Sequence, residues 1–112
     1  MVYIRPALAA AIIVIGSCFA MAPVNAETHQ YTIHIKDYIF HPKVLHVKPG
    51  DSVIYINDDD DGHTVTADDH SFDSGGIDTG EHWTHTFAKP GDYLYSCDLH
   101  PYVHGEVIVD PT

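Results

Sequence analysis

The chain has 112 residues, and its 5 Lys and Arg against 16 Asp and Glu give a formal net charge of −11 at pH 7. An acidic surface of this kind repels nucleic acid and anionic lipid, and it attracts basic partners. The length corresponds to one small domain with a limited hydrophobic core.

The first 26 residues have the pattern of an export signal. Arg5 supplies a positive start, residues 7–15 form an unbroken apolar run, and small residues lead to a cleavage site after Ala26. The run is too short for a membrane-spanning helix. We therefore expect a signal peptide over residues 1–26 and one mature domain over residues 27–112 in the periplasm.

A competing interpretation makes the same segment a lipid anchor. Residues 15–18 resemble a bacterial lipobox, in which Cys18 would be acylated and would become the first mature residue. If cleavage follows Ala26 instead, Cys97 is the single remaining cysteine. Exported proteins usually pair their cysteines in disulfides, so a lone exported thiol needs another explanation, such as a bound metal ion.

Seven short segments of the mature domain have strand patterns. In residues 31–36 apolar side chains alternate with polar ones, and further runs lie at residues 44–47, 53–56, 63–66, 82–87, 93–95 and 106–109. Turn signals rich in Pro, Gly and Asp separate these runs, and no segment has a helical period. The pattern predicts an antiparallel sandwich or barrel.

Two side chains that bind metal ions lie three residues apart in the last long loop. The thiolate of Cys97 and the imidazole of His100 can converge on one ion, which for mixed Cys and His ligands is usually copper or zinc. A third ligand has to come from elsewhere, and His63 is the best candidate because it opens a predicted strand after the turn at residues 58–62. A His₂Cys set suits copper that cycles between two oxidation states.

The order and spacing of several motifs resemble a known family. The motifs are residues 47–53, 63–66, 71–75, 84–87, 89–93 and 95–101. Together they resemble the small cupredoxins of the plastocyanin, amicyanin and pseudoazurin kind, which are blue type 1 copper proteins. The resemblance implies an all-β, Greek-key β-sandwich that carries one copper ion and transfers electrons. It also implies that His63, Cys97 and His100 are the three equatorial copper ligands.

The sequence departs from the family at the axial ligand. The family has a methionine where this chain has Val103, and a valine cannot coordinate a metal ion. Three interpretations stay open: a nearly trigonal copper with a raised reduction potential, a distant axial oxygen from the carbonyl of Gly62, or coordination by His104.

The resemblance also implies outer-sphere electron transfer through the edge of His100. We expect a redox partner to dock on an apolar patch of Pro101, Tyr102 and Val103 around that ring, and the acidic run Asp58–Asp61 to steer a basic partner. The protein is expected to be a monomer with no membrane span. The sequence has no general acid/base pair, so catalysis on an organic substrate is not expected.

Further histidines suggest a second hypothesis. After cleavage at Ala26 the chain begins Glu27-Thr28-His29, and a free amine with a third-position histidine can bind Cu(II) in a square plane. A group of His70, His82 and His85 is expected to face the copper-binding end, although His85 also fits a half-buried structural histidine. These features would suit a copper-tolerance protein that binds more than one copper ion and sequesters or oxidises Cu(I). A third hypothesis is a binding module of the same fold without metal.

Overall fold

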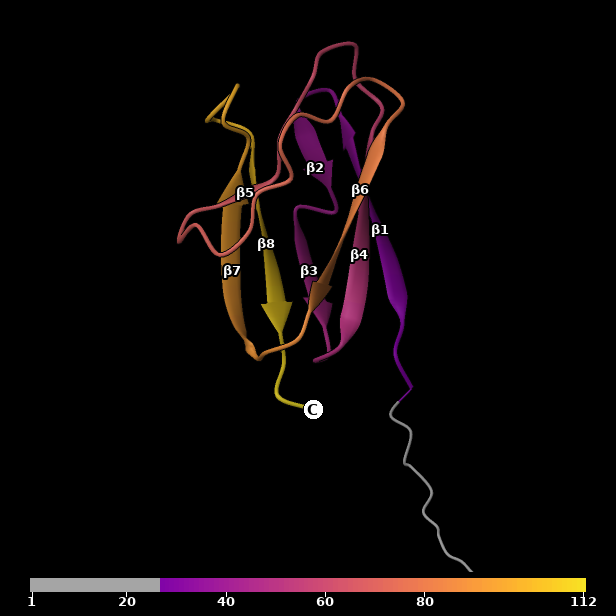
Figure 1. The fold of residues 1–112 in the computed structure, drawn as a ribbon, viewed down its shortest axis with the longest axis vertical. Helices are drawn as coiled ribbons and strands as arrows, with labels where there is room; N and C mark the ends of the chain where they lie inside the picture. The colour runs from indigo at the N-terminus through magenta and orange to yellow at the C-terminus, as the bar shows by residue number, and fades with distance from the viewer. Residues whose placement is uncertain (1–26) are drawn as a thin grey trace, which may run out of the picture.

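The structure, a computed structural model, describes residues 27–112, so the predicted signal peptide and Cys18 lie outside the described part of the chain. Residues 27–112 form eight strands and no helix, and thus no helix that could cross a membrane (Figure 1). The strands are β1 (Gln30–Lys36), β2 (Ile39–His41), β3 (Val44–Val47), β4 (Asp51–Asn57), β5 (Thr66–Ala67), β6 (His82–Phe87), β7 (Gly91–Ser96) and β8 (His104–Val109).

The strands form two four-stranded sheets, with the orders β2-β1-β4-β6 and β3-β8-β7-β5. The predicted all-β sandwich is therefore confirmed. The expectation of purely antiparallel pairing is wrong at two places, because β1 pairs with β4, and β3 with β8, in parallel. Parallel neighbours cannot be joined by a tight turn, and in both pairs the chain passes through strands of both sheets between the two partners.

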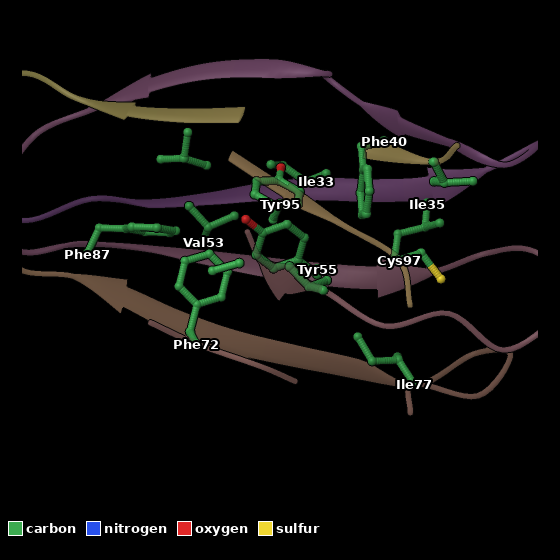
Figure 2. Packing of buried hydrophobic residues seen from close by; sticks show 14 of the residues in the cluster. Ile33, Ile35, Phe40, Val53, Tyr55, Phe72, Ile77, Phe87, Tyr95 and Cys97 are labelled. Carbon is green, nitrogen blue, oxygen red and sulfur yellow. The ribbon is translucent and has the colours of Figure 1, made fainter. Parts of the chain in front are cut away.

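The core lies between the inner faces of the two sheets. Alternate residues of β1 point inward, so Ile33 and Ile35 are fully buried while their polar neighbours face solvent. Aromatic rings fill the centre, where Phe40 meets Tyr95 edge to face at 5.0 Å between ring centroids (Figure 2). Aromatic side chains bury a large area each, so this small domain obtains its core from few residues.

Strands β1 and β2 form a hairpin that the sequence pattern did not predict. Its two turn residues, Asp37 and Tyr38, have φ angles of 55° and 61°. Tight two-residue hairpins need positive φ at both positions, and glycine or asparagine usually supplies it. Here the backbone amides of Asp37 and Tyr38 donate to the carboxylate of Asp59, at 2.6 and 2.9 Å, and these bonds help to hold the turn.

The loops that carry the predicted ligands lie at the same end of the sandwich (Figure 1). The strand predicted at residues 63–66 is wrong, since β5 contains only Thr66 and Ala67. His63 lies in the preceding loop and is held by an isolated bridge to Ile77, with backbone hydrogen bonds of 3.1 and 2.7 Å. The bridge gives His63 a fixed backbone without making it part of a sheet.

Candidate metal centre

His63, Cys97 and His100 converge at this end of the sandwich. One nitrogen of each imidazole and the Sγ atom of Cys97 all lie within 4.8 Å of one another. His63 and Cys97 are fully buried, whereas His100 is half-buried. Among residues 27–112 this is the one group of three or more such side chains with that proximity.

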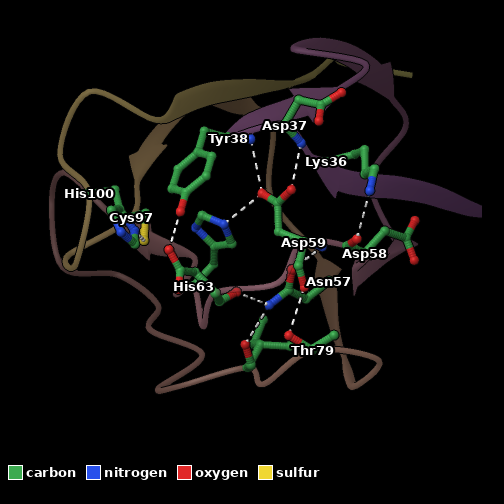
Figure 3. A network of polar contacts seen from close by, with 12 residues as sticks. Lys36, Asp37, Tyr38, Asn57, Asp58, Asp59, His63, Thr79, Cys97 and His100 are labelled. Atoms are coloured by element: carbon green, nitrogen blue, oxygen red, sulfur yellow. Dashed lines mark hydrogen bonds and ion pairs between the residues drawn. The ribbon is translucent and has the colours of Figure 1, made fainter.

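The ring of His63 is oriented by a buried carboxylate. Its Nε2 atom lies 2.8 Å from Oδ2 of Asp59, which is 4 % exposed, and an ionised carboxylate can only accept a hydrogen bond (Figure 3). The proton of the neutral ring is therefore on Nε2, and Nδ1 carries the lone pair. Nδ1 is buried and has no hydrogen-bond partner within the described chain. A buried lone pair without a donor fits a metal ligand.

The same Asp59 carboxylate joins the ligand loop to the β1–β2 turn. It accepts the amides of Asp37 and Tyr38 as well as the His63 ring, so three donors converge on one buried group. Burial by itself would raise the pKa of Asp59, but the hydrogen bonds from these three donors outweigh it and lower the pKa below its ordinary value. Asp59 therefore stays ionised at neutral pH.

Cys97 lies in a loop that is closed by its own backbone. The Cys97 amide donates to the carbonyl of Val103 at 2.9 Å, and the Val103 amide donates to the carbonyl of His100 at 2.8 Å. The Sγ atom lies 3.8 Å from Nδ1 of His100 and accepts the backbone N–H of Thr64 at 3.2 Å. An N–H directed at the sulfur stabilises negative charge there, as expected for a thiolate ligand.

Tyr38 covers the two histidines. Its ring meets His63 edge to face at 5.2 Å and His100 at 5.0 Å between centroids, and it stacks on Tyr102 at 6.3 Å. The hydroxyl donates to the carboxylate of Asp61, and this hydrogen bond is the main cause that raises the pKa of Tyr38 to about 12. Tyr38 therefore stays protonated at neutral pH, and its ring packs against both imidazoles.

The residues considered for the axial position lie in different environments. Val103 is 1 % exposed and offers only an apolar side chain. Gly62, half-buried, directly precedes His63, and its carbonyl oxygen accepts no hydrogen bond from residues 27–112. His104 is exposed on β8 and does not belong to the group formed by His63, Cys97 and His100.

The predicted docking patch needs one correction. The side chain of Val103, which directly precedes β8, belongs to the buried core and is 1 % exposed, so it cannot contact a partner. Pro101 is exposed, Tyr102 is 69 % exposed and Leu99 is 59 % exposed. The apolar surface beside His100 is therefore formed by Leu99, Pro101 and Tyr102, which we call the apolar patch.

The acidic run has several structural roles. Asp59 is buried, Asp58 lies 2.6 Å from the ring of His34, and Asp61 accepts the Tyr38 hydroxyl. Asp60 is exposed, and no side-chain hydrogen bond from it is seen within residues 27–112. The run is thus partly a framework for the metal centre, and its exposed carboxylates alone are available to a partner.

The other histidines do not assemble into a further centre of three ligands in the described chain. His70 and His82 are exposed, and His70 lies in a separate loop with a φ of 64°. His85 is half-buried and stacks on Trp83 at 5.3 Å, and burial lowers its pKa. His85 thus has the surroundings of a structural histidine.

The predicted terminal site is tied to the sandwich through His29. Its backbone amide donates to Oδ1 of Asp51 at 2.8 Å, and its carbonyl accepts from Ser52 at 3.0 Å. A square-planar Cu(II) site would need that amide nitrogen deprotonated and bound to the ion. The hydrogen bond to Asp51 competes with this reaction.

Comparisons with known proteins agree with the geometry. A family model described as a cupredoxin-like domain matches residues 7–109. The structure is similar to a purple cupredoxin from Nitrosopumilus maritimus, with 29% identity and a TM-score of 0.68 over 70% of this chain and 98% of that chain. A reduced Cu(I) form, at pH 4, of an amicyanin mutant has 30% identity and a TM-score of 0.66, over 70% of this chain and 80% of that chain.

A copper-containing nitrite reductase from Thermus scotoductus SA-01 is similar over part of its length. The identity is 28% and the TM-score 0.69, and the match covers 83% of this chain but 24% of the reductase. The family model spans most of the sequence, and the fold agrees with the purple cupredoxin over 98% of that chain and with the amicyanin mutant over 80% of that chain. This chain therefore belongs to the cupredoxin family of copper-binding electron-transfer proteins.

Proposed function

We propose that His63, Cys97 and His100 bind one copper ion as a type 1 centre, and that the protein carries single electrons between partners in the periplasm. The observation that carries the proposal is the buried Nδ1 atom of His63, which has no partner within the described residues and faces the thiol and the second imidazole. Bound copper supplies a one-electron redox couple. Two imidazoles and a thiolate are the donor set that such copper sites use.

Neighbouring residues keep the three ligand groups in a state that can bind copper. Asp59 holds the proton of His63 on Nε2, which keeps Nδ1 free to coordinate. The Thr64 amide stabilises the thiolate of Cys97, and the Tyr38 ring packs edge to face against both imidazoles. His100 is the half-buried member of the set, so its outer edge is the route by which an electron passes to a partner.

Copper titration with visible and electron paramagnetic resonance spectra tests this proposal. We expect one equivalent of copper to give a strong absorption band from the thiolate, and Cys97→Ser to abolish it. His82→Ala, a change at an exposed histidine, is the matched control and should leave the band unchanged. Protein that binds no copper would instead support the binding module without metal.

At the axial position we propose that the copper has no strong donor. Val103 supplies none, and the carbonyl of Gly62, which accepts no hydrogen bond from the described residues, is the weak oxygen donor that the chain offers beside His63. His104 would have to leave its exposed position to reach the ion. His104→Ala should therefore leave both spectra untouched, whereas altered spectra would assign His104 as a ligand.

We propose that the partner docks on the apolar patch beside His100. Leu99→Lys places a charge in this patch and should slow electron transfer to a basic c-type cytochrome or change its salt dependence. Leu94→Lys is the matched control, because Leu94 is 52 % exposed on β7, outside the patch. Rates to this cationic partner that do not fall with added salt would rule out steering by the acidic run.

The copper-tolerance hypothesis and the export route stay predictions. Copper stoichiometry above one ion per chain, lost in His29→Ala, would support the terminal site at Glu27-Thr28-His29. Mass spectrometry of the mature N-terminus distinguishes cleavage after Ala26 from acylation at Cys18. Cleavage after Ala26 would make the terminal site possible, and acylation of Cys18 would remove it.

A further inference from the structure

The outer face of the β2-β1-β4-β6 sheet carries two histidines directly opposite each other. His34 of β1 and His41 of β2 are register partners in the antiparallel hairpin, and both side chains are exposed. Side chains opposite each other in such a pair have Cβ atoms about 4.5–5.5 Å apart. Two histidines whose Cβ atoms have that separation can direct their imidazoles at the same ion.

Each ring already makes the contact that metal-bound histidines make with their other nitrogen. Nδ1 of His34 lies 2.6 Å from Oδ2 of Asp58, and Nε2 of His41 lies 3.1 Å from the carbonyl oxygen of Lys36. A carboxylate and a carbonyl only accept, so the neutral rings donate there and carry their lone pairs on Nε2 of His34 and Nδ1 of His41. Metal-ligating histidines almost always donate to a carboxylate, a carbonyl or water in this way.

The charges around the pair decide which ion fits. Neutral imidazoles suit copper, nickel and zinc, whereas magnesium and calcium prefer oxygen donors. The Asp58 carboxylate brings a negative charge to the pair, and Lys36, whose Nζ atom donates to the carbonyl of Asp58 at 3.3 Å, opposes it. An ion held by both rings would complete its coordination with water, because both side chains are exposed.

We propose that His34 and His41 form a second metal site on the surface of the sheet, which takes a divalent transition-metal ion such as Cu(II), with Asp58 as a positioning residue. The site shares no ligand with His63, Cys97 and His100, and it does not depend on the function proposed for them. It is also distinct from the predicted terminal site at residues 27–29.

A Cu(II) titration followed by electron paramagnetic resonance tests the site. Protein that already holds one equivalent of copper should give a second, tetragonal Cu(II) signal with nitrogen coupling, without any change in the absorption band. His34→Ala and His41→Ala should each weaken this second binding by about tenfold or more. His82→Ala is the matched control, because His82 is exposed on the same face but pairs with Ile56 and has no histidine opposite.

Substitutions of Asp58 and Lys36 test the role of the neighbours. Asp58→Ala should weaken second-site binding by about 10–100-fold, because no acceptor then fixes the His34 proton on Nδ1, and Asp58→Asn should weaken it less because its amide oxygen can still accept that proton. Lys36→Gln should strengthen binding, since it removes a positive charge beside the ion. Binding that is as weak in Asp58→Asn as in Asp58→Ala would overturn the assignment of Asp58 as a positioning residue.

The proposal and the type 1 centre fail in different ways. The second signal should persist in Cys97→Ser, which lacks the thiolate band whatever the surface site does. A second signal that disappears in His29→Ala and persists in His34→Ala would overturn the proposal and assign the ion to the terminal site. The absence of any second signal in the unmodified protein would also overturn it.

Discussion

Removal of the Asp59 carboxylate should weaken both the fold and the metal centre. Asp59→Ala leaves three donors without an acceptor: the amides of Asp37 and Tyr38 and the Nε2 atom of His63. The fully buried His63 donor loses a hydrogen bond to a charged group, worth about 1.5–3 kcal/mol. The two turn amides are partly buried and can reach water, so each costs roughly 1 kcal/mol. The sum is about 3.5–5 kcal/mol of unfolding free energy.

Asp59→Asn should be milder, because the amide oxygen can replace Oδ2 and still accept from both Tyr38 and His63. The amide nitrogen then faces the Asp37 amide, so one hydrogen bond is lost and the others become neutral. We expect a loss of about 1–3 kcal/mol. Copper affinity should fall by about 10–100-fold in Asp59→Ala and by less in Asp59→Asn, because only the former frees the His63 proton to move to Nδ1.

Urea unfolding of the metal-free protein and competition for copper with a chelator measure these two effects. Asp60→Asn is the matched control, because Asp60 is an exposed neighbour, and neither quantity should change. If Asp59→Ala binds copper as tightly as the unmodified protein, the inferred control of the His63 proton is incorrect. If Asp59→Asn is as damaging as Asp59→Ala, the charge and not the geometry of the acceptor is decisive.

Three further predictions concern other parts of the sandwich. Burial by itself would raise the pKa of Asp51, but the backbone hydrogen bonds to its carboxylate outweigh burial and lower the folded pKa below 3.8. The stabilisation by Asp51 is therefore complete above pH 3.8 and is lost as the pH falls through the folded pKa. Asp51→Asn should flatten the fall in stability in that range, and an unchanged acid limb of the stability curve from urea melts would contradict this. A Cβ atom at Gly105 would lie 2.9 Å from the hydroxyl oxygen of Tyr95 and 3.0 Å from its ring carbons Cε1 and Cζ, so Gly105→Ala should cost about 1–3 kcal/mol in the same melts. Adding Tyr95→Phe should not recover this loss, because the two ring carbons remain. A clear recovery in the double variant would show that the oxygen alone is the obstacle. Val103→Met should lower the reduction potential by adding an axial thioether. Because Val103 is 1 % exposed, the larger side chain should overpack the core and lower the unfolding free energy by about 1–3 kcal/mol. Voltammetry that shows a higher potential would refute this interpretation of the axial position.

The strands were predictable where their side chains alternate. Residues 31–36 and 82–87 have a period of two, and the structure has β1 and β6 there. Strand β2 was missed because it has three residues and follows a turn without glycine. The Asp59 carboxylate that holds this turn is 21 residues away from Tyr38 in the sequence, so no local pattern contains the information.

The candidate ligands were easier to predict than the groups that orient them. Cys97 and His100 share one loop, and a short spacing of that kind is visible in a sequence. Asp59 was obscured by the acidic run, which has the composition of a solvated turn, although its position four residues before His63 was a usable signal. Tyr38 had no signal at all, because it reaches the centre only through the left-handed turn at the end of β1.

Thr64 connects the two ligand loops without any help from a metal ion. Its amide donates to Sγ of Cys97, and its hydroxyl oxygen accepts the amide of Asp98 at 2.8 Å, so one residue beside His63 fixes both the sulfur and the loop that carries it. Donors held in place by the protein have little left to rearrange when the charge of a bound ion changes by one. The rate of electron exchange depends on how far the surrounding atoms must move. By linking the loop of His63 to the loop of Cys97, Thr64 thus favours a low reorganisation energy for electron transfer.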